Sequence, residues 1–301
     1  MSKQEISDRI AQLKKERNAV ILAHNYQLGE VQDIADYVGD SLGLSQKAAA
    51  AGEQVIVFCG VHFMAETASI LSPTKTVLLP EISAGCPMAD MITAEELREW
   101  KQRYPGRKVV AYVNTTAEVK AESDICCTSA NAVSVVDSIP DEEILFVPDK
   151  HLAAYVASQT KKRIIAWDGY CNIHDSILAS DILMKRRLHP GAEVWAHPEC
   201  RAEVIDLADK VCSTGKMVKE ARETAKKEIV LATEAGLIYR LKKENPDKDF
   251  YPARESALCP NMKKINLSRV LVSLDKMIYK IEVPFEISRR ARGAIERMVK
   301  L

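Results

Sequence analysis

The sequence carries no net charge, because its 42 Lys and Arg residues balance its 42 Asp and Glu residues. Without a surplus of positive charge, the chain has no overall field to attract it to nucleic acid or to an anionic membrane. No apolar run approaches the roughly 18 residues that a bilayer-spanning helix needs. Residues 1–17 are charged and amphipathic, unlike a signal peptide. We therefore expect a cytoplasmic protein that binds neither nucleic acid nor membrane.

The sequence does contain enough apolar residues to form buried cores. Its fractions of 47% hydrophobic and 28% charged residues are those of a globular protein rather than a disordered or collagen-like one. Short apolar runs alternate with segments of helical periodicity, which is typical of parallel sheets built from βα units. The expected strands are 20–24, 55–61, 75–81, 108–114, 143–148, 163–169, 192–199 and 228–233.

These strands belong to a pattern that repeats about every 85 residues. The segment that ends at Ser41 matches one that ends 88 residues later at Ser129, and a third that ends 85 residues further on at Thr214. An Asp also recurs in each copy. The repeat predicts three similar α/β/α units, each with a small parallel sheet of about four strands. The expected units are 1–85, 86–170 and 171–258, and a segment of closing helices follows at 259–301.

Polar residues follow the strands at equivalent positions in the three units. The three sets are His24, Tyr112 and His197; Tyr26, Asn114 and Glu199; and Ser41, Ser129 and Thr214. Because parallel α/β sheets bind ligands beyond the carboxyl ends of their strands, we predict that these residues form one site. The hydroxyl residues are also expected to cap the helices that follow them, and a helix N-terminus can bind an anion.

Eight cysteines are the unusual part of the composition. Reducing conditions disfavour disulfides in the cytoplasm, so metal or catalytic roles are favoured. Cys86, Cys171 and Cys259 recur once per unit, each just before an expected helix whose dipole favours a thiolate. Three thiolates are one ligand short of a closed zinc site, so a [4Fe-4S] cluster with one open iron fits better. The other five are expected to be packing residues: Cys59, Cys126, Cys127, Cys200 and Cys212.

Nearly the whole chain resembles the quinolinate synthase family. The resemblance is carried by ILAHNYQ, DIADYVGDSL, GCPMAD, YVNTTAE, CTSANAV, HPEC, STGKM, TEAGLIYRL and CPNMKK. It implies a pseudo-threefold arrangement of the three units. It also implies the condensation of iminosuccinate (iminoaspartate) with dihydroxyacetone phosphate to quinolinate, phosphate and water in de novo NAD biosynthesis. An L-aspartate oxidase or dehydrogenase would then be the functional partner that supplies iminosuccinate.

The resemblance also implies roles for individual residues. Cys86, Cys171 and Cys259 would hold the [4Fe-4S] cluster, whose open iron would act as a Lewis acid. Substrate would bind to His24, Ser41, Tyr112, Asn114, Ser129, His197, Glu199 and Thr214. Tyr26, Glu199 and His197 would be the catalytic acid–base residues. His174 is expected either to support the cluster site or to stabilise a helix. Some family members carry a C-x-x-C pair near the C-terminus, but here CPNM supplies only Cys259, so no disulfide switch is expected.

Two other functions fit parts of this pattern. Hydroxymethylbutenyl diphosphate reductase also has three units, three cysteines and an open iron, but AHNYQ and HPEC are not its motifs. A non-enzymatic iron–sulfur sensor would need an output module, and the three repeats leave no residues for one. Radical chemistry with S-adenosylmethionine is disfavoured because the chain lacks C-x-x-x-C-x-x-C.

Overall fold

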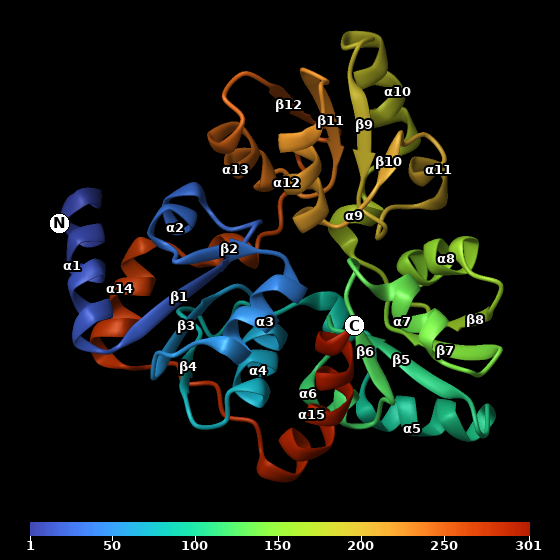
Figure 1. Cartoon of the computed structure of the whole chain (residues 1–301), viewed down its shortest axis with the longest axis horizontal. Helices are drawn as coiled ribbons and strands as arrows, with labels where there is room; N and C mark the ends of the chain where they lie inside the picture. The colour runs from blue at the N-terminus through green and yellow to red at the C-terminus, as the bar shows by residue number, and fades with distance from the viewer.

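The fold consists of three small parallel sheets of identical strand order. A computed structural model describes residues 1–301. The sheets have the orders β2-β1-β3-β4, β6-β5-β7-β8 and β10-β9-β11-β12, and every strand pair within them is parallel. Helices flank each sheet, and the three units surround a common centre (Figure 1). The predicted α/β class and the three similar α/β/α units are confirmed.

The first unit begins with a helix that is capped by its own sequence. Ser2 and Glu5 form a reciprocal capping box at the start of α1 (Lys3–Glu16). The elements that follow are β1 (Ala19–His24), α2 (Gly29–Ile34), β2 (Tyr37–Gly39), α3 (Ser41–Ala50), β3 (Val55–Cys59), α4 (His62–Leu71) and β4 (Thr76–Leu78).

The second and third units repeat this order. The second contains η1 (Pro87–Asp90), α5 (Ala94–Arg103), β5 (Lys108–Tyr112), α6 (Ala117–Ala121), β6 (Ile125–Cys127), α7 (Ala132–Ser138), β7 (Glu143–Val147), α8 (Lys150–Gln159) and β8 (Arg163–Ala166). The third contains α9 (Asn172–Asp175), α10 (Ala179–Leu188), β9 (Glu193–Ala196), α11 (Ala202–Ile205), β10 (Lys210–Val211), α12 (Thr214–Glu223), β11 (Glu228–Ala232), α13 (Leu237–Glu244) and β12 (Asp249–Pro252).

The Asp that recurs in each repeat joins the second strand to the first. Asp36 accepts a hydrogen bond from the amide of Ile21, and the equivalent bonds run from Val109 to Asp124 and from Val194 to Asp209. These N–O distances are 2.8, 2.9 and 2.7 Å. The carboxylate thus satisfies an amide at the sheet edge, where the short second strand does not reach.

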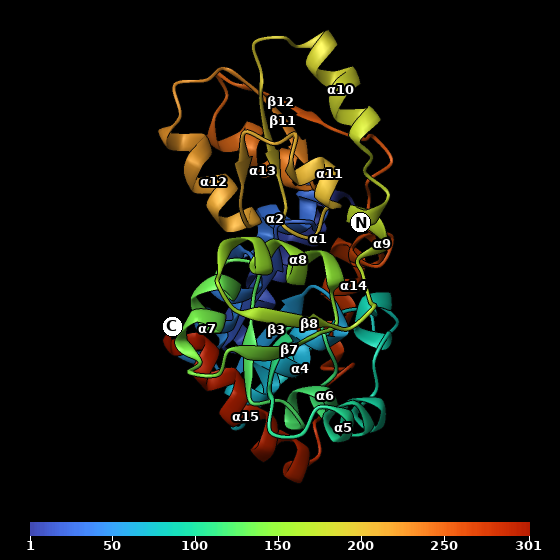
Figure 2. The same cartoon turned by 90° about the vertical axis from the view of Figure 1, so that its right-hand side faces the viewer.

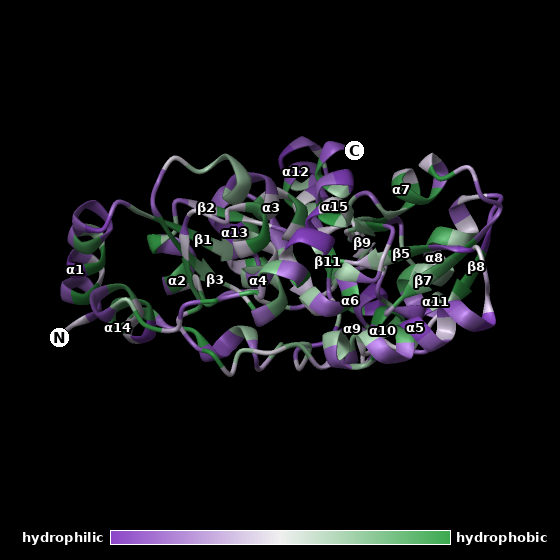
Figure 3. Cartoon of the chain, turned by 90° about the horizontal axis from the view of Figure 1, so that it is seen from below, coloured by the Kyte–Doolittle hydropathy of each residue, from purple (hydrophilic) through white to green (hydrophobic).

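The central strands are buried on both faces, as their almost continuous apolar sequences predict. Coloured by hydropathy, they lie inside helices whose outer faces are hydrophilic (Figure 3). A core of 71 buried residues includes most of the first two units, whereas a separate cluster of 11 belongs to the third. The third unit accordingly stands apart from the other two when the molecule is viewed from the side (Figure 2).

The C-terminal segment fastens the first two units together. It contains η2 (Met262–Lys264), α14 (Leu267–Lys276) and α15 (Phe285–Lys300). Helix α14 packs on α1, whereas α15 contacts α4 of the first unit and both α6 and β6 of the second. The boundaries at 85/86, 170/171 and 258/259 remain our proposal for dividing the chain. None of the helices combines the length and the hydropathy that a membrane crossing would require.

Candidate active site

The carboxyl ends of the three sheets meet at a cavity that encloses about 770 Å³ of empty space. Every residue that the sequence nominated for the site lines this one cavity. They are His24, Tyr26, Ser41, Cys86, Tyr112, Asn114, Ser129, Cys171, His197, Glu199, Thr214 and Cys259. The five cysteines expected to be packing residues do not line it, and all five are buried. The repeat therefore brings together residues that are far apart in the sequence.

Two histidines at equivalent positions are held in the same tautomer by the chain itself. The amide of Tyr26 donates to Nδ1 of His24 at 3.2 Å, and the amide of Glu199 donates to Nδ1 of His197 at 3.3 Å. Burial lowers the pKa of each imidazole to about 3, so both are neutral at neutral pH. A neutral ring that accepts at Nδ1 carries its proton on Nε2, so each histidine is a neutral donor.

These donors and their neighbours direct three hydrogens at the cavity. Nε2–H of His197 donates to the hydroxyl of Ser129 at 3.2 Å, and the side-chain amide of Asn25 donates to the hydroxyl of Thr214 at 3.0 Å. Because both hydroxyl oxygens already accept a bond, their own hydrogens are free to donate to a ligand. With Nε2–H of His24, the cavity offers three neutral donors.

The expectation that the hydroxyl residues cap the following helices was wrong. The N-cap of α3 is Asp40, which accepts from the amide of Gly43, and that of α12 is Ser213, which accepts from the amide of Lys216. Ser41 and Thr214 are instead the first residues of those helices, and Ser129 lies three residues before α7. The three hydroxyls do not cap their helices, and those of Ser129 and Thr214 accept the bonds described above.

Glu199 lies at the centre of the cavity's polar network. Its Oε2 is 2.6 Å from Nδ1 of His174 and 3.6 Å from Nδ1 of His197, and its Oε1 has no hydrogen-bond partner. Burial by itself raises the pKa of Glu199, but His174, His197 and the hydroxyl of Tyr112 lower it to about 2. The carboxylate is therefore ionised at neutral pH, with one oxygen available to a ligand.

His174, whose role the sequence left open, connects Glu199 to Tyr26. Its Nε2 is 3.0 Å from the hydroxyl of Thr233 and 3.4 Å from that of Tyr26, and these two hydroxyls are 2.7 Å apart. Burial and the charge of Glu199 raise the pKa of Tyr26 well above its usual value, so the phenol keeps its proton at neutral pH. A continuous hydrogen-bonded chain thus joins a carboxylate to a phenol through an imidazole.

Sequence analysis missed three buried residues of the site, namely Thr233, Asp149 and Glu234. Asp149 accepts a hydrogen bond from the amide of Cys171 at 3.2 Å, and Glu234 accepts one from the amide of Cys259 at 3.0 Å. One signal could have found the carboxylates, because positions 149 and 234 are related by the same 85-residue offset as the other site residues.

The cavity also suits a sulfur-ligated metal group. Burial raises the pKa of all three thiols, that of Cys86 to about 12, so the thiolates form only with help from a cation or from strong donors. The chain supplies donors to each sulfur. They are the amides of Met88 and Ala89 for Cys86, of His174 for Cys171, and of Asn261 and Met262 for Cys259. None of the three cysteines is in a disulfide.

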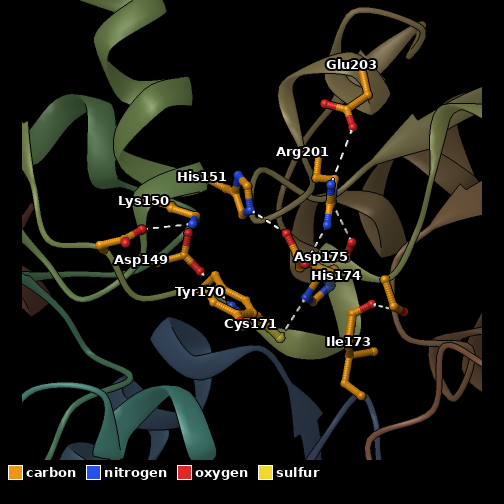
Figure 4. A network of polar contacts seen from close by, with 12 residues as sticks. Asp149, Lys150, His151, Tyr170, Cys171, Ile173, His174, Asp175, Arg201 and Glu203 are labelled. Atoms are coloured by element: carbon orange, nitrogen blue, oxygen red, sulfur yellow. Dashed lines mark hydrogen bonds and ion pairs between the residues drawn. The ribbon is translucent and has the colours of Figure 1, made fainter.

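Cys171, His174 and Glu199 form a second group whose donor atoms lie within 4.8 Å of one another. Hydrogen bonds explain this closeness, since Nδ1 of His174 is 2.6 Å from the carboxylate and 3.2 Å from the sulfur (Figure 4). A nitrogen that donates its proton in this way is not also a metal ligand. The set of one cysteine from each unit therefore fits a metal group better.

Fold and cavity together define a class of α/β proteins in which three similar units each place one cysteine in a shared central cavity. Residues 8–300 match the family model described as quinolinate synthetase A protein. A protein of Dehalococcoides mccartyi named quinolinate synthase is 60% identical over 296 residues, which cover 98% of each chain. Relatives of the same name from Thermodesulfovibrio yellowstonii and Methanosarcina barkeri are 57% and 54% identical, over 98% and 99% of this chain and 97% and 98% of their own. The chain belongs to the quinolinate synthase family, and it is an enzyme.

Proposed function

We propose that this enzyme condenses iminosuccinate with dihydroxyacetone phosphate and releases quinolinate, phosphate and water, as a step of de novo NAD biosynthesis. The observation that carries the proposal is the single cavity in which three cysteines and the polar residues of all three units converge. An L-aspartate oxidase or dehydrogenase would supply the unstable imine. The absence of net charge leaves substrate capture to the cavity rather than to a basic surface.

Cys86, Cys171 and Cys259 would hold a [4Fe-4S] cluster. When bound, the cluster would supply an open iron that acts as a Lewis acid on a substrate oxygen. Three cysteine ligands leave one iron without a protein ligand, and the free Oε1 of Glu199 lies in the same cavity. The protein side of this assignment is the donor set and its amide hydrogen bonds.

The substrates carry two carboxylates and one phosphate, and the three neutral donors suit these anions. His24, Ser129 and Thr214 each direct a hydrogen at the cavity without bringing a charge. The first turns of α3 and α12 add amide N–H groups that have no acceptor within their own helices. Orienting dipoles of this kind bind an anion while the cavity needs no buried arginine.

Two unpaired acceptors complete the recognition. Oδ1 of Asn114 and Oε1 of Glu199 are buried without partners, so each would gain a hydrogen bond from an imine N–H or a hydroxyl of a substrate. Tyr26 would donate a proton to a departing hydroxyl, and His174 would restore that proton because it contacts both Tyr26 and Glu199. Neutral His197 would bind substrate and, through its ring, hold Ser129.

Anaerobic reconstitution tests the proposal directly. The enzyme is purified without oxygen, its iron and acid-labile sulfide are counted, and quinolinate is assayed after addition of both substrates. We expect about four irons and four sulfides per chain, with quinolinate formed. Bound zinc with no product would overturn both the cofactor and the reaction. Iron without product would overturn the reaction and favour a sensor.

A further inference from the structure

The loop that follows the third strand of each unit contacts the loop that carries the unit's cysteine. In all three units a backbone hydrogen bond joins the two loops two residues before that cysteine. The bonds run from His62 to Ala84, from Lys150 to Gly169 and from Ala235 to Ala257, with N–O distances of 2.8, 2.8 and 2.9 Å. Their positions are related by the same offsets as the cysteines, so this backbone contact belongs to the repeat itself.

A side-chain contact is added to this loop pair in only two of the units. The residue just before each donor is Val61, Asp149 or Glu234. Oδ2 of Asp149 accepts the amide hydrogen of Cys171 at 3.2 Å (Figure 4), and Oε1 of Glu234 accepts that of Cys259 at 3.0 Å. Val61 has no acceptor, so the amide of Cys86 receives no equivalent bond.

Both carboxylates are themselves rigidly placed. Asp149 is fully buried, and its other oxygen accepts from the amide of Leu152 at 2.8 Å, which caps α8. Glu234 is only 1% exposed; its second oxygen accepts from the amide of Gly236 at 2.7 Å, and Nζ of Lys263 is 2.8 Å from Oε1. A carboxylate held at one oxygen by its own chain fixes the direction of the hydrogen bond made by the other.

The loop of the first unit has more freedom. The residue before Cys86 is Gly85, and a Cβ built there would meet no atom within 4 Å. The equivalent residue before Cys171 is Tyr170, whose ring lies 4.9 Å from Nζ of Lys150. The Cys86 loop therefore lacks both the carboxylate and a comparable packing contact.

We propose that Asp149 and Glu234 are positioning residues that fix the main chain at Cys171 and Cys259, and that Cys86 is the adjustable ligand of the three. This inference rests on the proposed function, because it takes the three cysteines as the ligands of one metal group. Two preorganised sulfurs would fix where the group sits, and the third would adapt as the group enters or leaves. Partners that orient metal ligands through hydrogen bonds typically change metal affinity by about 10- to 100-fold.

The test measures how fast iron leaves the reconstituted protein in an excess of a ferrous chelator. We expect Asp149→Leu and Glu234→Leu to release iron about 10- to 100-fold faster than the wild type. Asp149→Asn keeps one acceptor oxygen and should fall between the two. Val61→Asp adds an acceptor to the loop beside Cys86, and Asp is also a favoured N-cap for α4, so this variant should release iron more slowly.

A matched control separates positioning from general stability. Thr93 caps α5 through the amide of Glu96 and contacts no cysteine loop, so Thr93→Ala loses a cap as Asp149→Leu does. We expect Thr93→Ala to lower the thermal midpoint of the metal-free protein without changing iron release. Release at the wild-type rate from folded Asp149→Leu and Glu234→Leu would overturn the positioning role, as would equal acceleration in Thr93→Ala. An unchanged rate in Val61→Asp would overturn the assignment of Cys86 as the adjustable ligand. Wild-type protein that takes up no iron would instead refute the proposed function.

Discussion

Helices α3 and α12, from the first and third units, begin side by side at the cavity, with one carboxylate between them. Asp40 caps α3 by accepting from the amide of Gly43 at 3.0 Å, and it also accepts from the hydroxyl of Ser213 at 3.2 Å. A Cβ added at Gly215 of α12 would lie 2.4 Å from Oδ2 of Asp40 and 2.9 Å from its Cγ. The substitution Gly215→Ala therefore displaces Asp40.

The size of this effect follows from three contributions. Displacing Asp40 removes the cap of α3, which costs about 1 kcal/mol, and crowding at the contact adds about 1–3 kcal/mol. Against this, Ala in a helix is favoured over Gly by up to about 1 kcal/mol. We expect Gly215→Ala to lower the free energy of unfolding by about 1–3 kcal/mol. In an Asp40→Ala background the clash is absent, so the same substitution should become stabilising by up to about 1 kcal/mol.

Chemical unfolding of the metal-free proteins measures this reversal of sign through a double-mutant cycle. Gly52→Ala is the control, because a Cβ there meets no atom within 4 Å, and its midpoint should change little. We also expect Gly215→Ala to raise the KM of the loaded enzyme, since Ser41 and Thr214 begin the two helices that the clash pushes apart. An equal cost of Gly215→Ala in both backgrounds would refute the contact between the first and third units.

Three further predictions concern the chemistry of the cavity. Glu199→Gln should bind substrate but lower kcat by about 10²- to 10⁴-fold in steady-state assays, and a near-normal kcat would reject its acid–base role. Ser129→Ala and Thr214→Ala should each raise the KM of one substrate, and two unchanged KM values would show that the hydroxyls do not hold the anions. Burial lowers the pKa of His24 and His197 from 6.5 to about 3, so only the unfolded chain takes up these protons as the pH falls below 6.5. Their contribution to stability is complete above pH 6.5 and is lost between about 6.5 and 3, with a slope of up to about 1.4 kcal/mol per pH unit for each histidine. Unfolding of the metal-free protein at pH 7 and pH 5 checks this slope, His197→Asn should make it shallower, and equal stability at both values would contradict it.

The repeat made the fold and most of the site predictable. A period of about 85 residues carries strand order, connection lengths and the edge carboxylate together, and Asp36, Asp124 and Asp209 play the same structural part in each unit. The expected strand at 192–199 was too long, because the chain turns after Ala196 and the amide of Cys200 bonds back to His197. Strand β12 was not identified individually, since Asp249–Pro252 is short and ends at a proline.

What the sequence did not reveal depends on contacts between units. Asp149 and Glu234 look like ordinary loop carboxylates until the fold brings the amides of Cys171 and Cys259 to them. Thr233 ends a buried strand as an unremarkable residue, and only the third dimension places it beside Tyr26. The capping role failed for a local reason, because Asp40 and Ser213 are better placed by one residue to accept the amides of the first turn.

The charges of the cavity indicate when Glu199 becomes an effective base. With a pKa near 2 it is ionised but weakly basic, because His174, His197 and Tyr112 stabilise its charge. The bound histidines are neutral donors, so an incoming dicarboxylate adds negative charge that no side chain of the cavity cancels. Negative charge beside a buried carboxylate raises its pKa. Substrate binding should therefore move Glu199 toward the range in which proton transfer at neutral pH is efficient, and the same site would remain unreactive while it is empty.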